Sequence, residues 1–254
     1  MELRGATTLV TGAGGGIGVA ICDELTKRGA NVLAADVPGS GVDVEADLAD
    51  PAGPAKLVEA AGEVDVLVNN AGVEFVGSFL RHTQAELEAI TRINLLAPME
   101  LTRLALPGME ARGYGHVVNM SSLAGRVPTA WTSTYSATKQ GIVGLTHALR
   151  AEYALSPIGF SVICPGFVSD AGMYGRHEDA VKAPAALGSL PPSKVGNAVA
   201  EAVQKDRAEI VVNARPVKPI LALAASAPAA AARLAERIGA NETWRQVAER
   251  KGRL

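Results

Sequence analysis

The chain has 254 residues, a length that suits one α/β domain or two small ones. Hydrophobic residues make up 48% of it and aromatic residues only 4%, so it can bury a sizeable core. Its formal net charge of −2 gives no support for nucleic-acid binding as the main task. The two cysteines, Cys22 and Cys164, are far apart and in no metal-ligand spacing, which favours a reducing compartment.

No signal peptide or membrane-spanning helix is expected. The strand-like run TTLVTG begins at residue 7, without the basic segment and long apolar segment of a signal peptide. No uninterrupted apolar stretch reaches the ~20 residues that a spanning helix needs. We therefore expect a cytoplasmic protein.

Short apolar runs alternate along the chain with longer helical patterns. The runs predicted as buried strands lie at 7–12, 30–36, 42–46, 64–72, 115–122, 159–166 and 209–214. Helix-length stretches between them include 17–28, 84–111, 134–154 and 192–205. This alternation predicts an α/β fold: a Rossmann-like doubly wound parallel sheet of about seven strands, with helices on both faces. Ligands bind at the carboxyl ends of the strands in such folds.

The glycine-rich run TGAGGGIG at 11–18 joins the first predicted strand to the first helix. Glycine permits a tight turn and a close backbone approach, and the helix N-terminus is a natural seat for a pyrophosphate. Asp36 ends the second strand, where a carboxylate can accept hydrogen bonds from both ribose hydroxyls of an adenosine. No Arg or Lys occurs between Arg28 and Lys56 to attract a 2′-phosphate, so the pattern favours NAD over NADP. Asp47 and Leu48, after the third strand, are candidates to border the adenine.

The pentapeptide YSATK at 135–139 opens a predicted helix and places Tyr135 and Lys139 on one face. A nearby ammonium stabilises phenolate, which would bring a tyrosine pKa of ~10 towards neutrality and make it an acid/base catalyst. Taken alone, the pentapeptide is better interpreted as a surface tyrosine next to a surface lysine.

Six motifs occur in order: TGAGGGIG, NNAG at 69–72, Asn94, NMSSLAG at 119–125, YSATK, and PGFV at 165–168. With them, residues 5–214 resemble the short-chain dehydrogenase/reductase family. The resemblance implies that Tyr135 is the general acid/base and that Lys139 binds the nicotinamide ribose and favours the phenolate. Ser122 would bind the substrate oxygen, with Ser121 as the alternative, and Asn94 would help hold a water that relays protons. The cofactor contacts that it implies are Gly12, Gly16, Ile17, Gly18, Asp36, Asp47, Leu48, Asn70, Ala71, Gly72, Tyr135, Lys139, Pro165, Gly166 and Val168.

No metal site is predicted, because His82, His116, His147 and His177 are scattered along the chain. No motif places a histidine or an acid to activate Ser122 as a nucleophile. One departure from the family concerns the turn PGFVSD, where Asp170 stands at a position that is often Thr. Ser169 is a candidate to replace that hydroxyl.

The predicted substrate loop, 169–193, lacks a Lys/Arg cluster for a phosphorylated or coenzyme-A substrate. An apolar wall is expected from Met173, Tyr174, Phe75, Leu123 and Val127, although Phe75 and Leu123 could equally be core residues. The expected substrate is therefore a secondary alcohol or ketone with an apolar body.

The chain divides by composition into residues 1–214, the dinucleotide-binding domain, and a basic helical extension, 215–254. The extension has a net charge of +5, against −7 for the rest of the chain. It could rest on an anionic membrane surface, or, as we prefer, pack on the body or on a second subunit and cover the active site. The family resemblance also implies a homodimer or homotetramer through the helices at 84–111 and 134–154.

The sequence thus predicts an NAD(H)-dependent alcohol dehydrogenase or ketone reductase. A second hypothesis is a non-catalytic NAD-sensing protein on the same fold, which would have no use for an intact Asn94–Ser122–Tyr135–Lys139 set. A third is a sugar-nucleotide epimerase or dehydratase of the related longer branch, for whose substrate domain the extension is too short.

Overall fold

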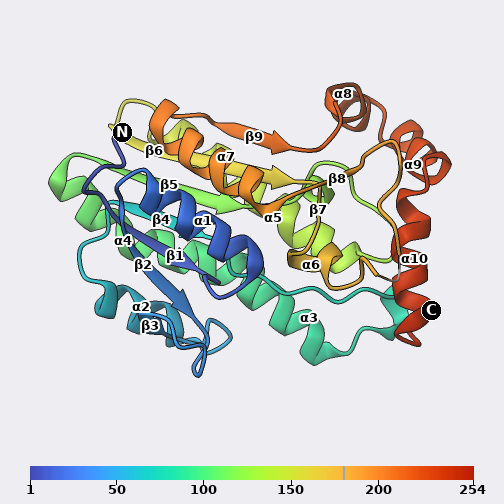
Figure 1. Cartoon of the computed structure of the whole chain (residues 1–254), viewed down its shortest axis with the longest axis horizontal. Coiled ribbons are helices and arrows are strands. Elements are labelled where there is room, and N and C mark those ends of the chain that lie inside the picture. The colour runs from blue at the N-terminus through green and yellow to red at the C-terminus, as the bar shows by residue number, and fades with distance from the viewer. Residues whose placement is uncertain (180) are drawn as a thin grey trace.

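The computed structural model describes residues 1–179 and 181–254, so residue 180 of the expected substrate loop lies outside the described residues. A seven-stranded parallel sheet forms the centre, in the order β3-β2-β1-β4-β5-β6-β9 (Figure 1). This confirms the predicted doubly wound fold. The order reverses between β1 and β4, where a crevice for a ligand is expected. The strands are β1 (Thr7–Thr11), β2 (Asn31–Asp36), β3 (Val44–Glu45), β4 (Val66–Asn69), β5 (Gly115–Met120), β6 (Ile158–Pro165) and β9 (Glu209–Val212).

Helices cover both faces of the sheet, and a short parallel pair, β7 (Phe167–Val168) with β8 (Ser189–Leu190), lies beyond β6. The helices are α1 (Gly16–Lys27), α2 (Gly53–Ala61), α3 (Gln84–Thr91), α4 (Ala97–Arg112), α5 (Ser133–Glu152), α6 (Gly172–Gly175), α7 (Pro192–Lys205), α8 (Lys218–Ser226), α9 (Pro228–Arg237) and α10 (Ala240–Arg250). In Figure 1 the strand arrows point towards the side where α6 and α8–α10 lie.

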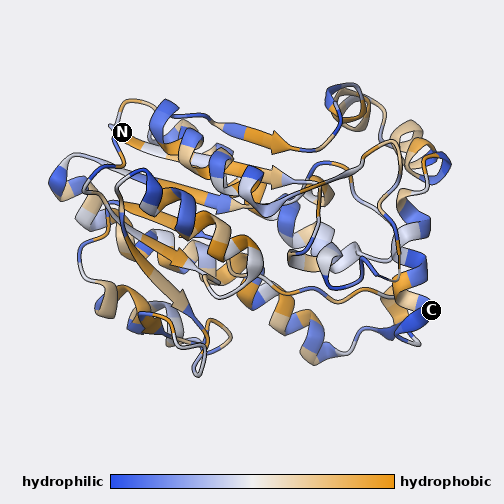
Figure 2. Ribbon diagram, viewed as in Figure 1, coloured by the Kyte–Doolittle hydropathy of each residue, from blue (hydrophilic) through white to orange (hydrophobic). Residues whose placement is uncertain are grey.

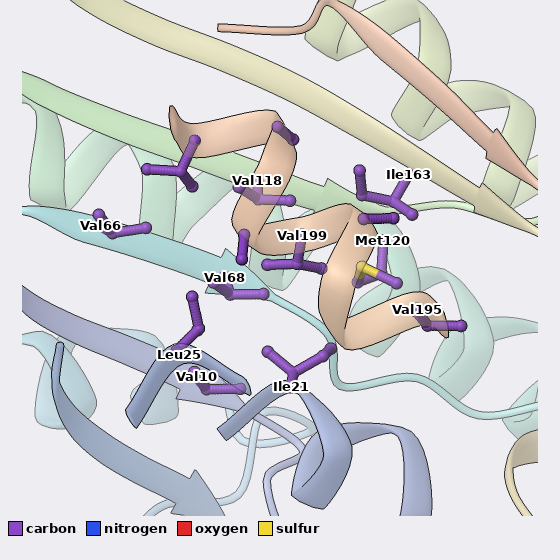
Figure 3. Packing of buried hydrophobic residues seen from close by; sticks show 14 of the residues in the cluster. Val10, Ile21, Leu25, Val66, Val68, Val118, Met120, Ile163, Val195 and Val199 are labelled. Atoms are coloured by element: carbon purple, nitrogen blue, oxygen red, sulfur yellow. The ribbon is translucent and has the colours of Figure 1, made fainter. Parts of the chain in front are cut away.

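Two apolar layers follow from the alternation of side chains along the buried strands. Val10, Val66 and Val68 face α1 and α7, where Ile21 and Val199 complete the packing shown in Figure 3. The intervening strand residues Leu9 and Leu67 lie on the other side of the sheet, where they cluster with Leu57 of α2 and with Leu101 and Met109 of α4. Figure 2 accordingly shows hydrophobic residues concentrated on the strands. Both faces are therefore covered, as the continuous apolar runs predicted.

The single helix predicted at 84–111 is wrong in one respect, because a π-helical turn at Arg92–Leu96 separates α3 from α4. Pro98 lies in the first turn of α4 and has no N–H to donate to the carbonyl of Asn94. The Asn94 side chain binds the backbone of Val73 at both its oxygen and its nitrogen. The helix is thus widened at the residue that the sequence analysis singled out, and such turns often mark functional sites.

The extension 215–254 forms α8, α9 and α10, with Pro228 beginning a new helix after the break at Ala227. Buried Trp244, Val247 and Ala248 of α10 share one hydrophobic cluster with Phe167 and Tyr174. The extension therefore packs on the body of its own chain, and this packing covers the apolar face of α10. Among the described residues, no helix combines the length and the apolarity needed to cross a bilayer.

The last residues fasten the extension to the segment before α3. The backbone carbonyl of Arg253 accepts a hydrogen bond from the Ser78 N–H at 2.7 Å, and its guanidinium pairs with Glu86 at 2.6 Å. A Cβ on Gly77 would lie only 2.8 Å from the Cβ of Arg253, so this contact needs glycine at 77. We call these contacts the C-terminal clamp.

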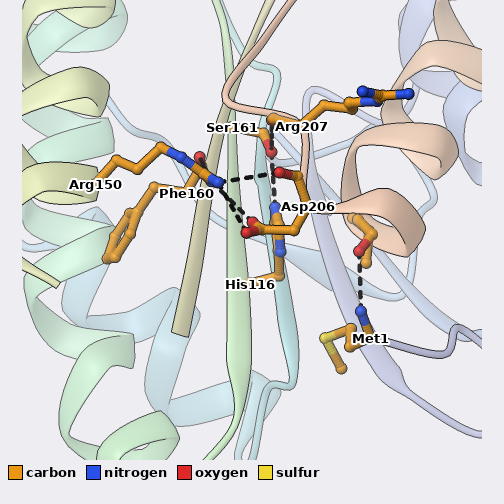
Figure 4. Close-up of polar contacts among 8 residues, drawn as sticks. Met1, His116, Arg150, Phe160, Ser161, Asp206 and Arg207 are labelled. Atoms are coloured by element: carbon orange, nitrogen blue, oxygen red, sulfur yellow. Dashed lines mark hydrogen bonds and ion pairs between the residues drawn. The ribbon is translucent and has the colours of Figure 1, made fainter. Parts of the chain in front are cut away.

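A polar cluster, in which His116 and Ser161 are buried, closes the opposite end of the sheet (Figure 4). His116 on β5 shares a 2.8 Å hydrogen bond with Ser161 on β6, and the Ser161 hydroxyl donates to the carbonyl of Arg207. Asp206 binds the guanidinium of Arg150 through both carboxylate oxygens at 2.8 Å. Serine, histidine and aspartate meet here, but Ser161 is wholly buried and its proton is engaged, so the cluster is structural.

This cluster predicts that the protein loses stability in mild acid. Burial lowers the pKa of His116 from 6.5 to about 4. Between pH 6.5 and pH 4, His116 is protonated in the unfolded chain but not in the folded protein. The contribution of neutral His116 is therefore complete above pH 6.5 and is lost as the pH falls, by on the order of 3 kcal/mol at pH 4. Urea unfolding of wild type and His116→Gln across this range should give a flatter pH dependence for the variant. Parallel curves would contradict the prediction.

Candidate active site

A cavity of about 400 Å³ opens at the carboxyl ends of the strands. It extends from the glycine turn, past the ends of β2 and β3, to α6 and the extension. Sixteen of the seventeen predicted site residues line it, and only Asn94 lies behind its wall. The lining residues are Gly12, Gly16, Ile17, Gly18, Asp36, Asp47, Leu48, Asn70, Ala71, Gly72, Ser122, Tyr135, Lys139, Pro165, Gly166 and Val168.

The glycine turn between β1 and α1 is shaped by close backbone contacts. Gly12 has a φ of +66°, and a Cβ there would lie 2.8 Å from the Cα of Ala71. A Cβ on Gly18 would overlap the carbonyl oxygen of Gly12. Asn70 closes the turn from β4, since its side-chain amide donates to the carbonyls of Thr11 and Gly12 at 3.0 and 3.1 Å. The turn therefore leaves an open backbone cradle at the start of α1, which fits a pyrophosphate.

Asp36 lies at the end of β2, beside this cradle. Its carboxylate accepts hydrogen bonds from the N–H groups of Gly14 and Val37, both at 2.8 Å. Asp47 and the buried Leu48 line the same part of the cavity, and the Asp47 carboxylate accepts a hydrogen bond from Ala49. The residues expected to surround an adenosine are thus brought together by the ends of two neighbouring strands.

Tyr135 and Lys139 lie one turn apart on α5, both almost fully buried, and the Lys139 ammonium is 5.7 Å from the centre of the Tyr135 ring. Lys139 donates a 2.8 Å hydrogen bond to the carbonyl of Met120, at the end of β5. The two side chains therefore share one helix face, as their spacing predicted.

The structure separates the roles of the two neighbouring serines. Ser121 is buried, and its hydroxyl donates to the carbonyl of Lys139 at 2.8 Å, which fastens β5 to α5. Ser122 lies close enough to Tyr135 to act on its pKa, and its hydroxyl caps the next turn by accepting a hydrogen bond from the Ala124 N–H. The Ser121 hydroxyl is thus engaged by the backbone of α5, whereas Ser122 lines the cavity beside Tyr135.

Asn94 lies behind the cavity wall and is only 1% exposed. A Cβ on Gly72 would lie 3.3 Å from its side-chain oxygen and 3.4 Å from the Lys139 nitrogen, so the three residues meet at one point. Its side-chain amide also approaches Thr138 on α5 at 3.3 Å. The widened helix thus brings Asn94 next to Lys139.

Burial dominates the electrostatics of Tyr135 and Lys139. It raises the pKa of Tyr135 well above its usual value of 10, and the neighbouring Ser122 hydroxyl opposes this rise. Burial also lowers the pKa of Lys139, to about 8. Desolvation thus disfavours both charged forms, and the stabilisation of the phenolate by Lys139 stays a prediction.

The comparison with protein families agrees with this geometry. The family model described as short chain dehydrogenase matches residues 6–181, which include the glycine turn, Asn94, Ser122, Tyr135 and Lys139. The chain belongs to the short-chain dehydrogenase family. It is therefore an enzyme of an oxidoreductase family whose members bind NAD(P).

Several relatives of this short-chain dehydrogenase are similar over most of its length. The ketoacyl reductase HetN of Nostoc sp. is 39% identical over 234 residues, which cover 85% of this chain and 81% of the relative. The D-beta-hydroxybutyrate dehydrogenase of Cupriavidus necator is 36% identical over 185 residues, covering 65% of this chain and 72% of the relative. A solved structure titled as a putative NAD(P)-dependent gluconate 5-dehydrogenase from Beutenbergia cavernae, with bound NADP, is 30% identical. It has a TM-score of 0.73 and covers 83% of this chain and 96% of that one.

The turn after β6 carries the departure from the family pattern. Asp170 has a φ of +57°, a backbone conformation that aspartate tolerates far better than a β-branched threonine. Its N–H donates to Glu178 at 2.7 Å. The Ser169 hydroxyl donates to the carbonyl of Leu190 at 3.3 Å, and neither residue lines the cavity. Ser169 therefore does not supply the hydroxyl that we expected at the cofactor.

The wall beyond Tyr135 is largely apolar, as predicted, but its composition differs. Met173, Tyr174, Leu123 and Val127 line the cavity, whereas Phe75 does not. The extension supplies six further lining residues: Val217, Ile220, Ala235, Ile238, Ala240 and Trp244. The Trp244 ring stacks on Phe167 with centroids 5.8 Å apart. No motif in the sequence marks Trp244, and the surface that it covers is known only from the fold.

Arg176 is a charged lining residue that the sequence analysis did not single out. It follows α6, and its guanidinium donates to Glu74, a residue 102 positions earlier, at 3.1 Å. No motif marks either residue. Within residues 1–179 and 181–254, no group of histidine, cysteine and acidic side chains is arranged to hold a metal ion.

Proposed function

We propose that this protein interconverts a secondary alcohol and a ketone with NAD(H), using Tyr135 as its acid/base catalyst. The observation that carries the proposal is the meeting of Ser122, Tyr135 and Lys139 on the wall of the cavity that also contains the glycine turn. The names of two relatives, a ketoacyl reductase and a hydroxybutyrate dehydrogenase, support a substrate of this kind.

The cavity residues fit a dinucleotide. Because the glycines of the turn have no Cβ, the turn leaves room for a pyrophosphate. Asp36 lies where it can bind the adenosine ribose. Asp47 and Leu48 would border the adenine, with Asn70, Ala71 and Gly72 along the cofactor. Pro165, Gly166 and Val168 would lie against the nicotinamide. When bound, the nicotinamide supplies the hydride chemistry, and the protein positions it and manages one proton.

Tyr135 would take a proton from the substrate hydroxyl during oxidation, or return it to the carbonyl oxygen during reduction. Ser122 would donate a hydrogen bond to the same oxygen and stabilise the negative charge that develops on it. Lys139 would bind the nicotinamide ribose, and its positive charge would favour the phenolate once a proton leaves Tyr135. Asn94 would help hold a water molecule next to Lys139 and so connect the site to solvent.

Asp36 predicts a preference for NAD(H). A 2′-phosphate placed beside its carboxylate would be repelled, and no lining residue near Asp36 carries a positive charge. Wild type should therefore give the higher kcat/KM with NAD(H), and Asp36→Asn should narrow the difference between the two cofactors by roughly tenfold, about 1.4 kcal/mol. The measurement is of initial rates with both cofactors. Asp43→Asn is the control, because Asp43 is an acid outside the cavity. If Asp36→Asn and Asp43→Asn reduce the difference in kcat/KM between the two cofactors equally, the proposed role of Asp36 is refuted.

Assembly and location are also proposals. A homodimer or homotetramer would form through the exposed faces of α4 and α5, and the protein would work in the cytoplasm. The position of α10 against the body favours the extension as a wall of the active site over membrane contact.

A further inference from the structure

The charged residues that line the cavity are two acids and two cations. Asp36 and Asp47 lie at the adenosine end, and Lys139 lies next to Tyr135. Arg176 is the other cation, on the wall formed by α6 and the extension. Among the described lining residues, it is the charged side chain that the proposed reaction does not use.

Arg176 is held in place by an acid from another part of the chain. Glu74 follows the NNAG turn, its side chain is only 3% exposed, and one of its oxygens binds the guanidinium at 3.1 Å. The Arg176 side chain is 59% exposed. A guanidinium has five N–H donors, and the described contacts use one of them on Glu74. The remaining donors are free to bind a ligand from a fixed position.

The backbone around Arg176 is anchored as well. A Cβ on Gly16 would lie 2.8 Å from the Cβ of Ala171, and a Cβ on Gly172 would lie 2.9 Å from Ile17. The segment that carries Arg176 therefore packs directly on the glycine turn. The segment is thus held next to the cofactor cradle.

Two cations act on the buried Glu74. Burial raises the pKa of Glu74, and the charges of Arg176 and of Lys251 on the extension oppose this rise. Glu74 and Arg176 also act through space on Tyr135: the charge of Glu74 adds to the rise in the Tyr135 pKa, and the charge of Arg176 opposes it. An anion bound at Arg176 would thus lie within electrostatic reach of the reacting oxygen.

We propose that Arg176 binds a carboxylate of the substrate, so that the enzyme acts on a hydroxy acid or keto acid whose apolar part packs on Trp244 and Phe167. This inference rests on the proposed function. The planar fork of a guanidinium matches a carboxylate with two parallel hydrogen bonds, which an ammonium cannot provide. The buried Glu74 positions Arg176 and does not itself contact the substrate.

The test compares α-, β- and γ-hydroxy acids with their methyl esters, which keep the chain and remove the charge. Wild type should prefer one of the acids over its ester. Arg176→Gln should lower kcat/KM for that acid by roughly 10- to 100-fold, mainly through KM, and change the ester little. Arg176→Lys should recover only part of the loss. Lys182→Gln, an exposed cation on the same loop that does not line the cavity, is the matched control.

A binding measurement separates this inference from the reaction itself. The keto acid and its ester are each titrated, by calorimetry, into the protein loaded with oxidised cofactor. The complexes formed in this way cannot react. Tighter binding of the acid, lost in Arg176→Gln, supports the carboxylate site even if no alcohol is turned over. Equal binding of acid and ester, or equal losses of both in the variant, overturns it even if the dehydrogenase activity is present.

Discussion

Replacing Tyr135 by phenylalanine is expected to lower kcat/KM by roughly 10²- to 10⁴-fold, because the variant loses the group that moves the proton. The ring remains to pack beside Lys139, so dinucleotide affinity should change little. Steady-state rates and a fluorescence titration of NADH measure the two effects separately. Tyr174→Phe is the matched control, since Tyr174 lines the same cavity and its hydroxyl accepts a hydrogen bond from the Ala183 N–H.

The two tyrosines should therefore behave differently. If Tyr174→Phe loses as much activity as Tyr135→Phe, the loss reflects the shape of the cavity and not proton transfer. If Tyr135→Phe retains wild-type turnover, Tyr135 is not the acid/base catalyst.

The second large effect is expected from Gly18→Ala. The added Cβ would overlap the carbonyl oxygen of Gly12, which is backbone and cannot move aside without opening the turn. We expect a loss of about 3 kcal/mol in the free energy of unfolding and a severe loss of dinucleotide binding. Urea denaturation and NADH titration provide the measurements.

Gly144→Ala is the control for this substitution. Gly144 also lies in a helix, but a Cβ there would meet no atom within 4 Å. That variant should gain about 0.5–1 kcal/mol, since alanine favours a helix more than glycine does. A Gly18→Ala protein as stable as wild type and with unchanged NADH affinity would show that the turn tolerates a side chain.

The sequence was sufficient to predict the sheet and most of the site. Runs such as VDVLVNN are apolar at nearly every position because both faces of β4 are covered, and this pattern identified the buried strands. The glycine turn, Asp36, Ser122, Tyr135 and Lys139 all end strands or begin helices at the same edge of the sheet. Their convergence follows from the topology, because parallel strands bring their carboxyl ends together.

The remaining features depend on contacts between distant residues. Glu74 and Arg176 are 102 positions apart, and neither belongs to a repeating pattern. The π-helical turn at Asn94 arises from a side chain that binds Val73, although Pro98 is a local signal that could have suggested it. The pKa of Tyr135 depends on burial by the whole fold, which a pair of residues four positions apart does not reveal.

The C-terminal clamp has an evolutionary consequence. The extension reaches the active site from the end of the chain, and its contacts with Ser78 and Glu86 lie away from the glycine turn. Substitutions in its helices can therefore reshape the substrate wall while the cofactor cradle and the proton-transfer residues stay unchanged. Related enzymes can therefore acquire new substrates through changes in such a segment, while the central sheet stays the same.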